Sequence, residues 1–157
     1  MEKGVTFPPL QGKGLKIGIV RSQWNGDMTE ALVEQCVQAL QDHGVQKKDI
    51  ILLDVPGSYE LVFGAKTLID RYQCDVIVPI GVLLKGETMH FEYIASAVSQ
   101  GIMDLSLNTG VPIIFGVLTC LTKKQAEERS IGKKSHGYNW GLSAVQMAMI
   151  RKAKKKT

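Results

Sequence analysis

The chain has 157 residues, 45% of them apolar and 22% charged, which are the proportions of a folded globular domain. Its formal net charge of +4 comes from the last seven residues, because without them 14 basic side chains face 15 acidic ones. A protein that reads nucleic acid carries basic charge on its folded surface, and no apolar stretch approaches the length of a membrane span, so we expect neither a nucleic-acid partner nor a membrane.

Apolar periodicity predicts alternating strands and helices between an N-terminal arm and a basic tail. Asp27 or Thr29 is expected to cap the first helix. In chain order the expected segments are an arm (1–14), a strand (15–21), a helix ended by Gly44, a strand (50–55), a helix (59–72), a strand (75–80), a helix (91–107), a strand (111–118), two helices (near 123–130 and 139–152) and a basic tail (151–157).

The alternation predicts an α/β fold in one domain over residues 15–150. Strands that are apolar almost throughout indicate a parallel sheet covered on both faces. Right-handed crossovers then give a doubly wound sheet of four parallel strands flanked by helices, a flavodoxin-like three-layer sandwich. Ligands of such sheets bind outside the carboxyl ends of the strands. Trp24, residues 56–60, residues 86–90 and Thr119 each follow a predicted strand, so we expect them at this edge.

The run GVLLKGETMHFEYI (81–94) carries the clearest functional signal. A glycine-containing loop between a buried strand and a helix start, here with Gly86 and Thr88, can turn backbone N–H groups toward an anion. His90 lies where it can move protons at neutral pH. The chain has neither G-x-G-x-x-G after its first strand nor a P-loop, so we expect a phosphorylated ligand other than a nucleotide. The alternative is that the glycines only form a turn and that His90 is a surface residue.

Six segments together resemble the lumazine synthases, which form 6,7-dimethyl-8-ribityllumazine in riboflavin biosynthesis. They span about residues 15–149, and the Trp24 and HGYNWG elements look most like the fungal members. In chain order they are RSQWN (21–25), VPGSYEL (55–61), GVLLKGETMHFEYI (81–94), GVPIIFGVLT (110–119), QAEER (125–129) and HGYNWG (136–141).

The resemblance implies a reaction and its partners. The substrates would be 5-amino-6-(D-ribitylamino)pyrimidine-2,4-dione and 3,4-dihydroxy-2-butanone 4-phosphate, joined through an imine with loss of phosphate and water. No metal and no cofactor is implied, and riboflavin is a further candidate ligand. The chain would form a homo-oligomer whose active sites are shared between subunits, as a pentamer or a shell of pentamers. Three scattered cysteines and the absence of a signal peptide predict a cytoplasmic protein.

The resemblance also assigns the pyrimidine site. Trp24 would stack on the ring, and residues 82–84 would hold its edge. The second loop would meet the ribityl hydroxyls, chiefly through the Glu60 carboxylate. Without the resemblance, Glu60 would be an acid that complements a helix dipole. The residues assigned to this half are Trp24, Gly57, Ser58, Tyr59, Glu60, Val82, Leu83 and Leu84.

A second set of residues would handle the phosphate and the proton. Gly86, Glu87 and Thr88 would cradle the phosphate, Lys85 would assist electrostatically, and His90 would carry the proton. Arg129 would complete the phosphate site, and Phe115 and Arg129 would come from the neighbouring subunit, with His136 near the same pocket.

Departures from the family pattern and two other functions remain open. Ser130-Ile131 stands where relatives usually have Ala-Gly, the turn over 132–135 is short, and Asn139 and Gln146 replace acidic residues, which affects charge pairing near Arg129. A non-catalytic flavin- or pteridine-binding protein would need Trp24 and residues 56–60 but neither His90 nor Arg129. A nucleic-acid-binding module would rest on the basic tail alone.

Overall fold

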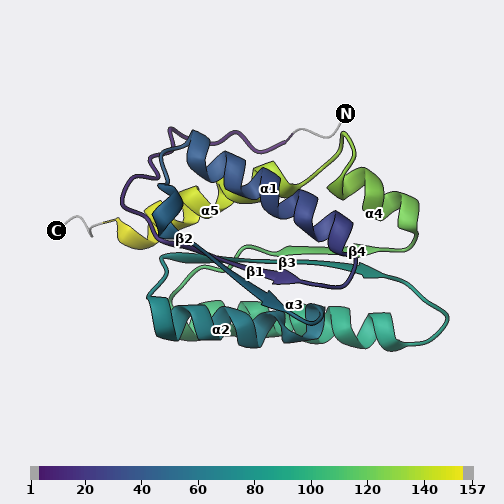
Figure 1. Cartoon of the computed structure of the whole chain (residues 1–157). Helices are drawn as coiled ribbons and strands as arrows, with labels where there is room; N and C mark the ends of the chain where they lie inside the picture. The colour runs from purple at the N-terminus through teal and green to yellow at the C-terminus, as the bar shows by residue number, and fades with distance from the viewer. Residues whose placement is uncertain (1–3, 154–157) are drawn as a thin grey trace.

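The structure, a computed structural model, describes residues 4–153 and forms a parallel four-stranded sheet with helices on both faces (Figure 1). This confirms the predicted α/β three-layer arrangement. The elements are β1 (Ile17–Ser22), α1 (Gly26–Asp42), a short 3₁₀ helix η1 (Lys47–Asp49), β2 (Ile50–Val55), η2 (Ser58–Glu60), α2 (Leu61–Tyr72), β3 (Val76–Leu84), α3 (His90–Thr109), β4 (Gly116–Cys120), α4 (Lys123–Ser130) and α5 (Gly137–Lys152).

The strand order is β2-β1-β3-β4, and every pair is parallel. The chain therefore winds outward from β1 to β2 on one side and from β3 to β4 on the other. The order reverses between β1 and β3, and the carboxyl ends of strands on either side of such a reversal leave a crevice in which ligands bind.

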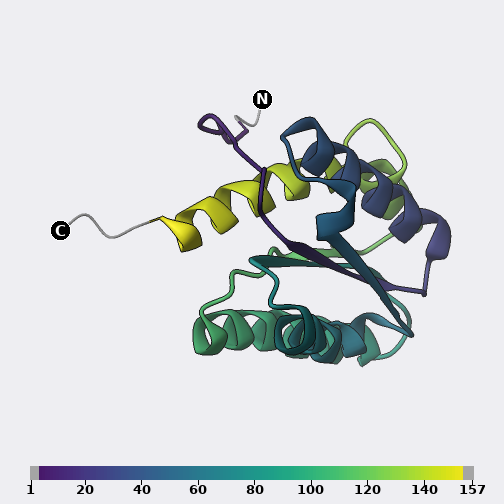
Figure 2. The ribbon, with the colours of Figure 1, turned by 60° about the vertical axis from the view of Figure 1, so that its left-hand side comes forward.

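Two apolar layers hold the sheet between its helices. Ile17 and Ile19 point to the side of α1 and α5, whereas the intervening side chains of the sheet, such as Val20 and Ile77, pack against α2 and α3. The turned view in Figure 2 shows the same two helical layers on opposite faces of the sheet. Near-continuous burial of β3 explains its almost uninterrupted apolar sequence.

Three details of the predicted elements were wrong. The third strand continues to Leu84 rather than ending at residue 80, because β4 pairs with it as far as Leu84. The fourth strand begins at Gly116 rather than at residue 111, because the preceding segment makes only an isolated bridge between Ile77 and Ile113, and Pro112 has no N–H to donate to a ladder. The first helix is capped by neither Asp27 nor Thr29. Asn25, at φ 57° and ψ 49°, is the N-cap and makes no side-chain capping bond.

Both ends of the described chain contact the body. In the arm, Gly12 N–H donates to the carbonyl of His43 at 2.7 Å. Arg151 and Lys152 form the last residues of α5, and both pair with Asp75, which is 8% exposed. The rest of the predicted basic tail, 154–157, lies outside the described residues. No helix within residues 4–153 combines the length and apolarity needed to cross a bilayer.

Candidate active site

A pocket of about 530 Å³ lies at the carboxyl ends of β1, β2 and β3. It is lined by residues 24–25, 56–60 and 82–84 together with His90 and Ile94. The structure thus brings together the sequence-predicted residues of the first and second loops, the end of the third strand and the start of α3. They meet at the reversal of strand order, where the fold directs ligands.

The first wall of this pocket carries an open aromatic ring. Trp24 is 73% exposed, although it follows a strand in which every residue but Arg21 is buried. Asn25 next to it donates from Nδ2 to the carbonyl of Val82 at 3.0 Å, which ties the end of β1 to the end of β3. An indole presented in this way offers a flat apolar face to a heterocycle.

The loop after β2 forms the opposite wall and orders an acidic side chain. Gly57 N–H donates to Glu60 Oε2 at 3.0 Å, and Glu60 N–H donates to the Gly57 carbonyl at 3.2 Å. Ser58 is buried, and Tyr59 is 63% exposed. A Cβ at Gly57 would lie 3.2 Å from both Trp24 Cδ1 and Glu60 Oε2, so the glycine lets the two walls approach each other.

The loop over 85–89 is exposed and leads into α3, which begins at His90. His90 N–H donates to Thr88 Oγ1 at 3.3 Å, and the N-terminal amides of a helix of this length favour an anion. Lys85 forms an ion pair with Glu92, and its Nζ lies 5.8 Å from the centre of the Phe91 ring. The charge of Lys85 is therefore compensated within the chain.

The remaining predicted residues lie elsewhere on the same chain. Phe115, Arg129 and His136 line a separate hollow of about 390 Å³ along β4, α4 and the start of α5. Arg129 donates from Nη1 to the Gln125 carbonyl at 3.1 Å. The rings of His136 and Trp140 are tilted, with centroids 6.0 Å apart.

Burial raises the pKa of Cys120, which lines this second hollow, and the charge of Arg129 opposes that shift. A thiol whose pKa is raised is a poor nucleophile at neutral pH. One chain thus holds two partial sets of the predicted residues, and neither hollow contains both His90 and Arg129.

Two lining residues were missed by sequence reasoning. Asn25 was part of a quoted motif but received no role, although asparagine is one of the few residues that readily take a left-handed conformation. Ile94 follows His90 by four residues on a helix, and this spacing places the two side chains on one face.

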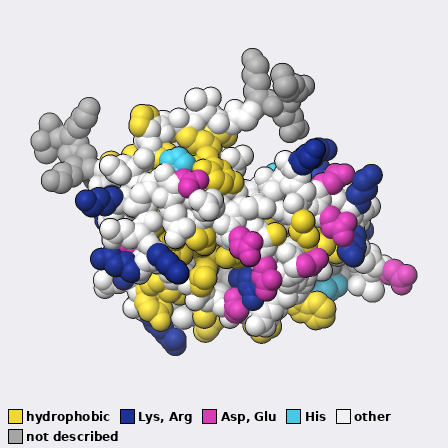
Figure 3. Space-filling view, turned by 45° about the horizontal axis from the view of Figure 1, so that its top comes forward, with side chains coloured by type: hydrophobic (Ala, Val, Ile, Leu, Met, Phe, Trp, Pro, Cys, Tyr) yellow, Lys and Arg dark blue, Asp and Glu magenta, His cyan; other side chains and the backbone are white. Residues whose placement is uncertain are grey.

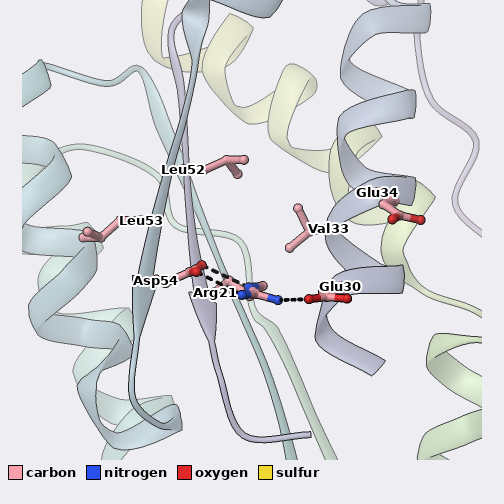
Figure 4. A pocket seen from close by; sticks show the side chains of 7 residues that line it. All are labelled: Arg21, Glu30, Val33, Glu34, Leu52, Leu53 and Asp54. Carbon is pink, nitrogen blue, oxygen red and sulfur yellow. Dashed lines mark hydrogen bonds and ion pairs between the residues drawn. The ribbon is translucent and has the colours of Figure 1, made fainter. Parts of the chain in front are cut away.

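A third hollow, of about 420 Å³, holds none of the predicted residues (Figure 4). It lies between α1 and the edge strand β2. Arg21 there makes two hydrogen bonds to the Asp54 carboxylate, at 3.0 and 2.9 Å, and a third to Glu30 at 2.9 Å. The bonds to Asp54 raise the pKa of Arg21 and lower that of Asp54. With two carboxylates on one guanidinium, the cluster holds β1, β2 and α1 together and has no net positive charge to attract an anion.

Surface charge is mixed outside these hollows. On the face seen in Figure 3, acidic and basic side chains are interspersed and apolar side chains reach the surface between them. Large apolar side chains are exposed as well, for example Phe63 of α2 at 77%, Tyr93 of α3 at 72% and Leu107 of α3 at 74%.

Comparison with known proteins agrees with this geometry. The family model described as 6,7-dimethyl-8-ribityllumazine synthase matches residues 14–152. Among curated proteins of that name, one from Schizosaccharomyces pombe is 43% identical over 150 residues, covering 94% of each chain. One from Flavobacterium psychrophilum is 43% identical over 140 residues, covering 88% of this chain and 74% of the relative. One from Pyricularia oryzae is 38% identical over 189 residues, covering 96% and 94%. The chain therefore belongs to the 6,7-dimethyl-8-ribityllumazine synthase family, enzymes of riboflavin biosynthesis.

Proposed function

We propose that the protein condenses 5-amino-6-(D-ribitylamino)pyrimidine-2,4-dione with 3,4-dihydroxy-2-butanone 4-phosphate to give 6,7-dimethyl-8-ribityllumazine, phosphate and water. The observation that carries the proposal is the pocket at the carboxyl ends of β1, β2 and β3. It combines an open indole, an ordered carboxylate and a histidine at a helix start. These are the groups that a ring, a polyol and a proton transfer require.

The pyrimidine binds in the pocket between the first two walls. Its ring stacks on Trp24, and residues 82–84 contact its edge. The ribityl hydroxyls donate to Glu60, whose carboxylate is held in place by Gly57 N–H. Holding the amine of this substrate close to the second reactant supplies much of the rate enhancement, because the reaction then proceeds within one complex.

The butanone phosphate binds at the start of α3. Its phosphate accepts hydrogen bonds from the exposed loop over 86–88 and from the helix N-terminus. Lys85 contributes little net charge, since Glu92 already pairs with it. A second cation is therefore needed to balance the negative charge of the phosphate. The planar guanidinium of Arg129 suits this role because it can donate two parallel hydrogen bonds to phosphate oxygens.

His90 moves protons between the two reactants. The amine of the pyrimidine attacks the ketone carbon, and loss of water gives an imine. His90 assists the removal of a proton from the butanone carbon skeleton as the C–O bond to phosphate breaks, so that the electron pair leaves with the phosphate. The enol left by this elimination becomes a carbonyl, and the second nitrogen attacks that carbonyl with loss of a second water, which closes the ring and completes the lumazine.

We also propose that the active site is completed by a second copy of the chain in a homopentamer, the number being that of the resemblance. The pocket with His90 and the hollow with Arg129 are different surfaces of one chain. Contact between different surfaces of identical chains generates a ring when the rotation closes. In that ring, Phe115, Arg129 and His136 of one subunit face the pocket of its neighbour.

We place the enzyme in the cytoplasm. Cys36, Cys74 and Cys120 are buried and unpaired, and burial raises the pKa of Cys36 to about 12. Thiols kept reduced in this way are typical of a reducing compartment.

A second candidate is a non-catalytic binder of riboflavin or a related pteridine. It is favoured by one observation, namely that Trp24, Tyr59 and Glu60 line the pocket within a single chain. Such a protein would not depend on Arg129.

The test is lumazine formation followed optically beside a protein-free blank, since the two substrates also condense unaided. The wild type should form lumazine faster than the blank, and His90→Ala should lower the maximal rate. Arg129→Ala should raise the concentration of butanone phosphate at which the rate is half-maximal. A wild type that matches the blank but changes its Trp24 fluorescence with riboflavin would favour the binder.

A further inference from the structure

Gln35 of α1 lies beneath the turn that separates Arg129 from His136. We propose that Gln35 is a positioning residue that fixes where these two side chains lie relative to the body of the protein and thereby sets affinity for the phosphorylated substrate. The proposal rests on the proposed function of the Arg129 hollow. Gln35 lines neither that hollow nor the pocket with His90, so it acts through other residues.

Both ends of the turn are bound to the one Gln35 amide group. Its Nε2 donates to the Ser130 carbonyl at 3.0 Å, and its Oε1 accepts from the Ser135 hydroxyl. Ser130 directly follows Arg129, and Ser135 directly precedes His136. A single side chain from another helix thus spans the whole connection between α4 and α5.

The turn has its own backbone bonds, which tie its ends together. His136 N–H donates to the Arg129 carbonyl at 3.1 Å, and Gly132 N–H donates to the Glu127 carbonyl at 2.8 Å. These bonds fix the shape of the turn but not its place on the sheet. Its outer side is exposed, with Ile131 54% accessible, whereas Ser130 on its inner side is fully buried. The two bonds to Gln35 therefore add to burial in anchoring the turn to the body.

Gln35 itself is held firmly. Its neighbours on α1, Leu32 and Cys36, are fully buried. The first residue of α5, Gly137, lies so close that a Cβ there would stand 2.7 Å from the Leu32 carbonyl and 2.8 Å from Gln35 Oε1. The start of α5 therefore packs directly against the Gln35 side chain, and this contact keeps the amide group next to the turn.

Loss of the amide would release both ends of the turn. The Ser130 carbonyl and the Ser135 hydroxyl would lose their partners in a partly buried place, and the turn would shift to reach water. Arg129 and His136 would then move together, because their backbones stay bonded to each other, and both would be displaced relative to the incoming phosphate. The affected quantity is affinity for the phosphorylated substrate, because Trp24 and Glu60 belong to a different surface.

The experiment compares Gln35→Leu, which keeps the volume but removes both bonds, with Gln38→Leu on the same helix. Within residues 4–153, the Gln38 side chain bonds only the exposed Asp42 carboxylate. Loss of one or two such bonds should raise the KM for butanone phosphate about three- to tenfold, with kcat and the KM for the pyrimidine nearly unchanged. Gln38→Leu should leave all three unchanged. Ser135→Ala, a milder change, should raise the same KM in the same direction, which keeps the test valid if Gln35→Leu folds poorly.

A second arm separates this inference from the proposed function. Binding of inorganic phosphate, measured by calorimetry, should weaken in Gln35→Leu and weaken no further when Gln35→Leu is added to Arg129→Ala. If the wild type binds phosphate but forms no lumazine, the proposed reaction fails while the role of Gln35 is still decided by this cycle. An unchanged KM and phosphate affinity in folded Gln35→Leu and Ser135→Ala, or an equal loss with and without Arg129, would overturn the inference.

Discussion

Gly57 lies between the two walls of the pyrimidine pocket, and replacing it with alanine should impair binding while sparing the fold. The added Cβ would stand 3.2 Å from Trp24 Cδ1 and from Glu60 Oε2. Favourable carbon contacts begin at about 3.5 Å, so each neighbour must retreat by at least about 0.3 Å. Gly57 has φ −141° and ψ −178°, which is extended backbone that alanine also adopts.

The cost to stability should be small and the cost to function measurable. Trp24 is 73% exposed and can move without disturbing the core, so the free energy of unfolding should change by less than about 1 kcal/mol. A misplacement of 1 Å costs about a hundredfold in rate. If Trp24 and Glu60 are displaced by a third to a half of 1 Å, kcat/KM for the pyrimidine should fall about four- to tenfold.

The assay is steady-state lumazine formation with the pyrimidine varied, beside urea unfolding of the same samples. Gly26→Ala is the matched control, because a Cβ at Gly26 meets no atom within 4 Å. An unchanged kcat/KM in Gly57→Ala, or a loss that Gly26→Ala shares, would refute the reasoning about the two walls.

Two further predictions concern charge. Hydrogen bonds from Arg21 lower the pKa of Asp54 below its ordinary value of 3.8, so the stability from this pair is present above about pH 4 and is lost as pH falls through the lowered pKa. Urea unfolding should therefore find Asp54→Asn less stable than the wild type by about 1 kcal/mol at pH 6, after screening, with the gap closing in acid; a gap independent of pH would contradict this. Glu92→Gln removes the partner of Lys85 and should tighten inorganic phosphate binding about two- to fivefold, whereas the same change in a Lys85→Met background should give no gain.

Sequence reasoning predicted the architecture because the dominant signals were local. Buried parallel strands read as continuous apolar runs, and helical spacing separated them. Those two signals also placed Trp24, the loop over 56–60 and His90 at one edge, since each follows a strand. Their convergence in one pocket needed only the topology.

The errors arose where tertiary contacts decided the outcome. Apolar character made 111–115 look like a strand, but Pro112 and the close approach of Gly116 to the Pro79 carbonyl restrict pairing to the stretch after residue 115. Asn25 caps α1 through its left-handed backbone conformation and not through a side-chain hydrogen bond, which is the signal used to predict a cap. Two further interactions, the Lys85–Glu92 ion pair and the hydrogen bond from Gln35 to the Ser130 carbonyl, could not be predicted because the sequence does not specify which residues meet.

The central claim is that His90 and Arg129 of one active site belong to different chains, and subunit mixing tests it most directly. His90→Ala and Arg129→Ala chains, each poorly active alone, are co-expressed with different tags and purified through both. Random assortment around a ring leaves about one quarter of the contacts with both residues intact, so mixed oligomers should recover about a quarter of wild-type activity. Mixed oligomers no more active than the average of the two variants would contradict the account, because sites built within one chain contain no intact pair.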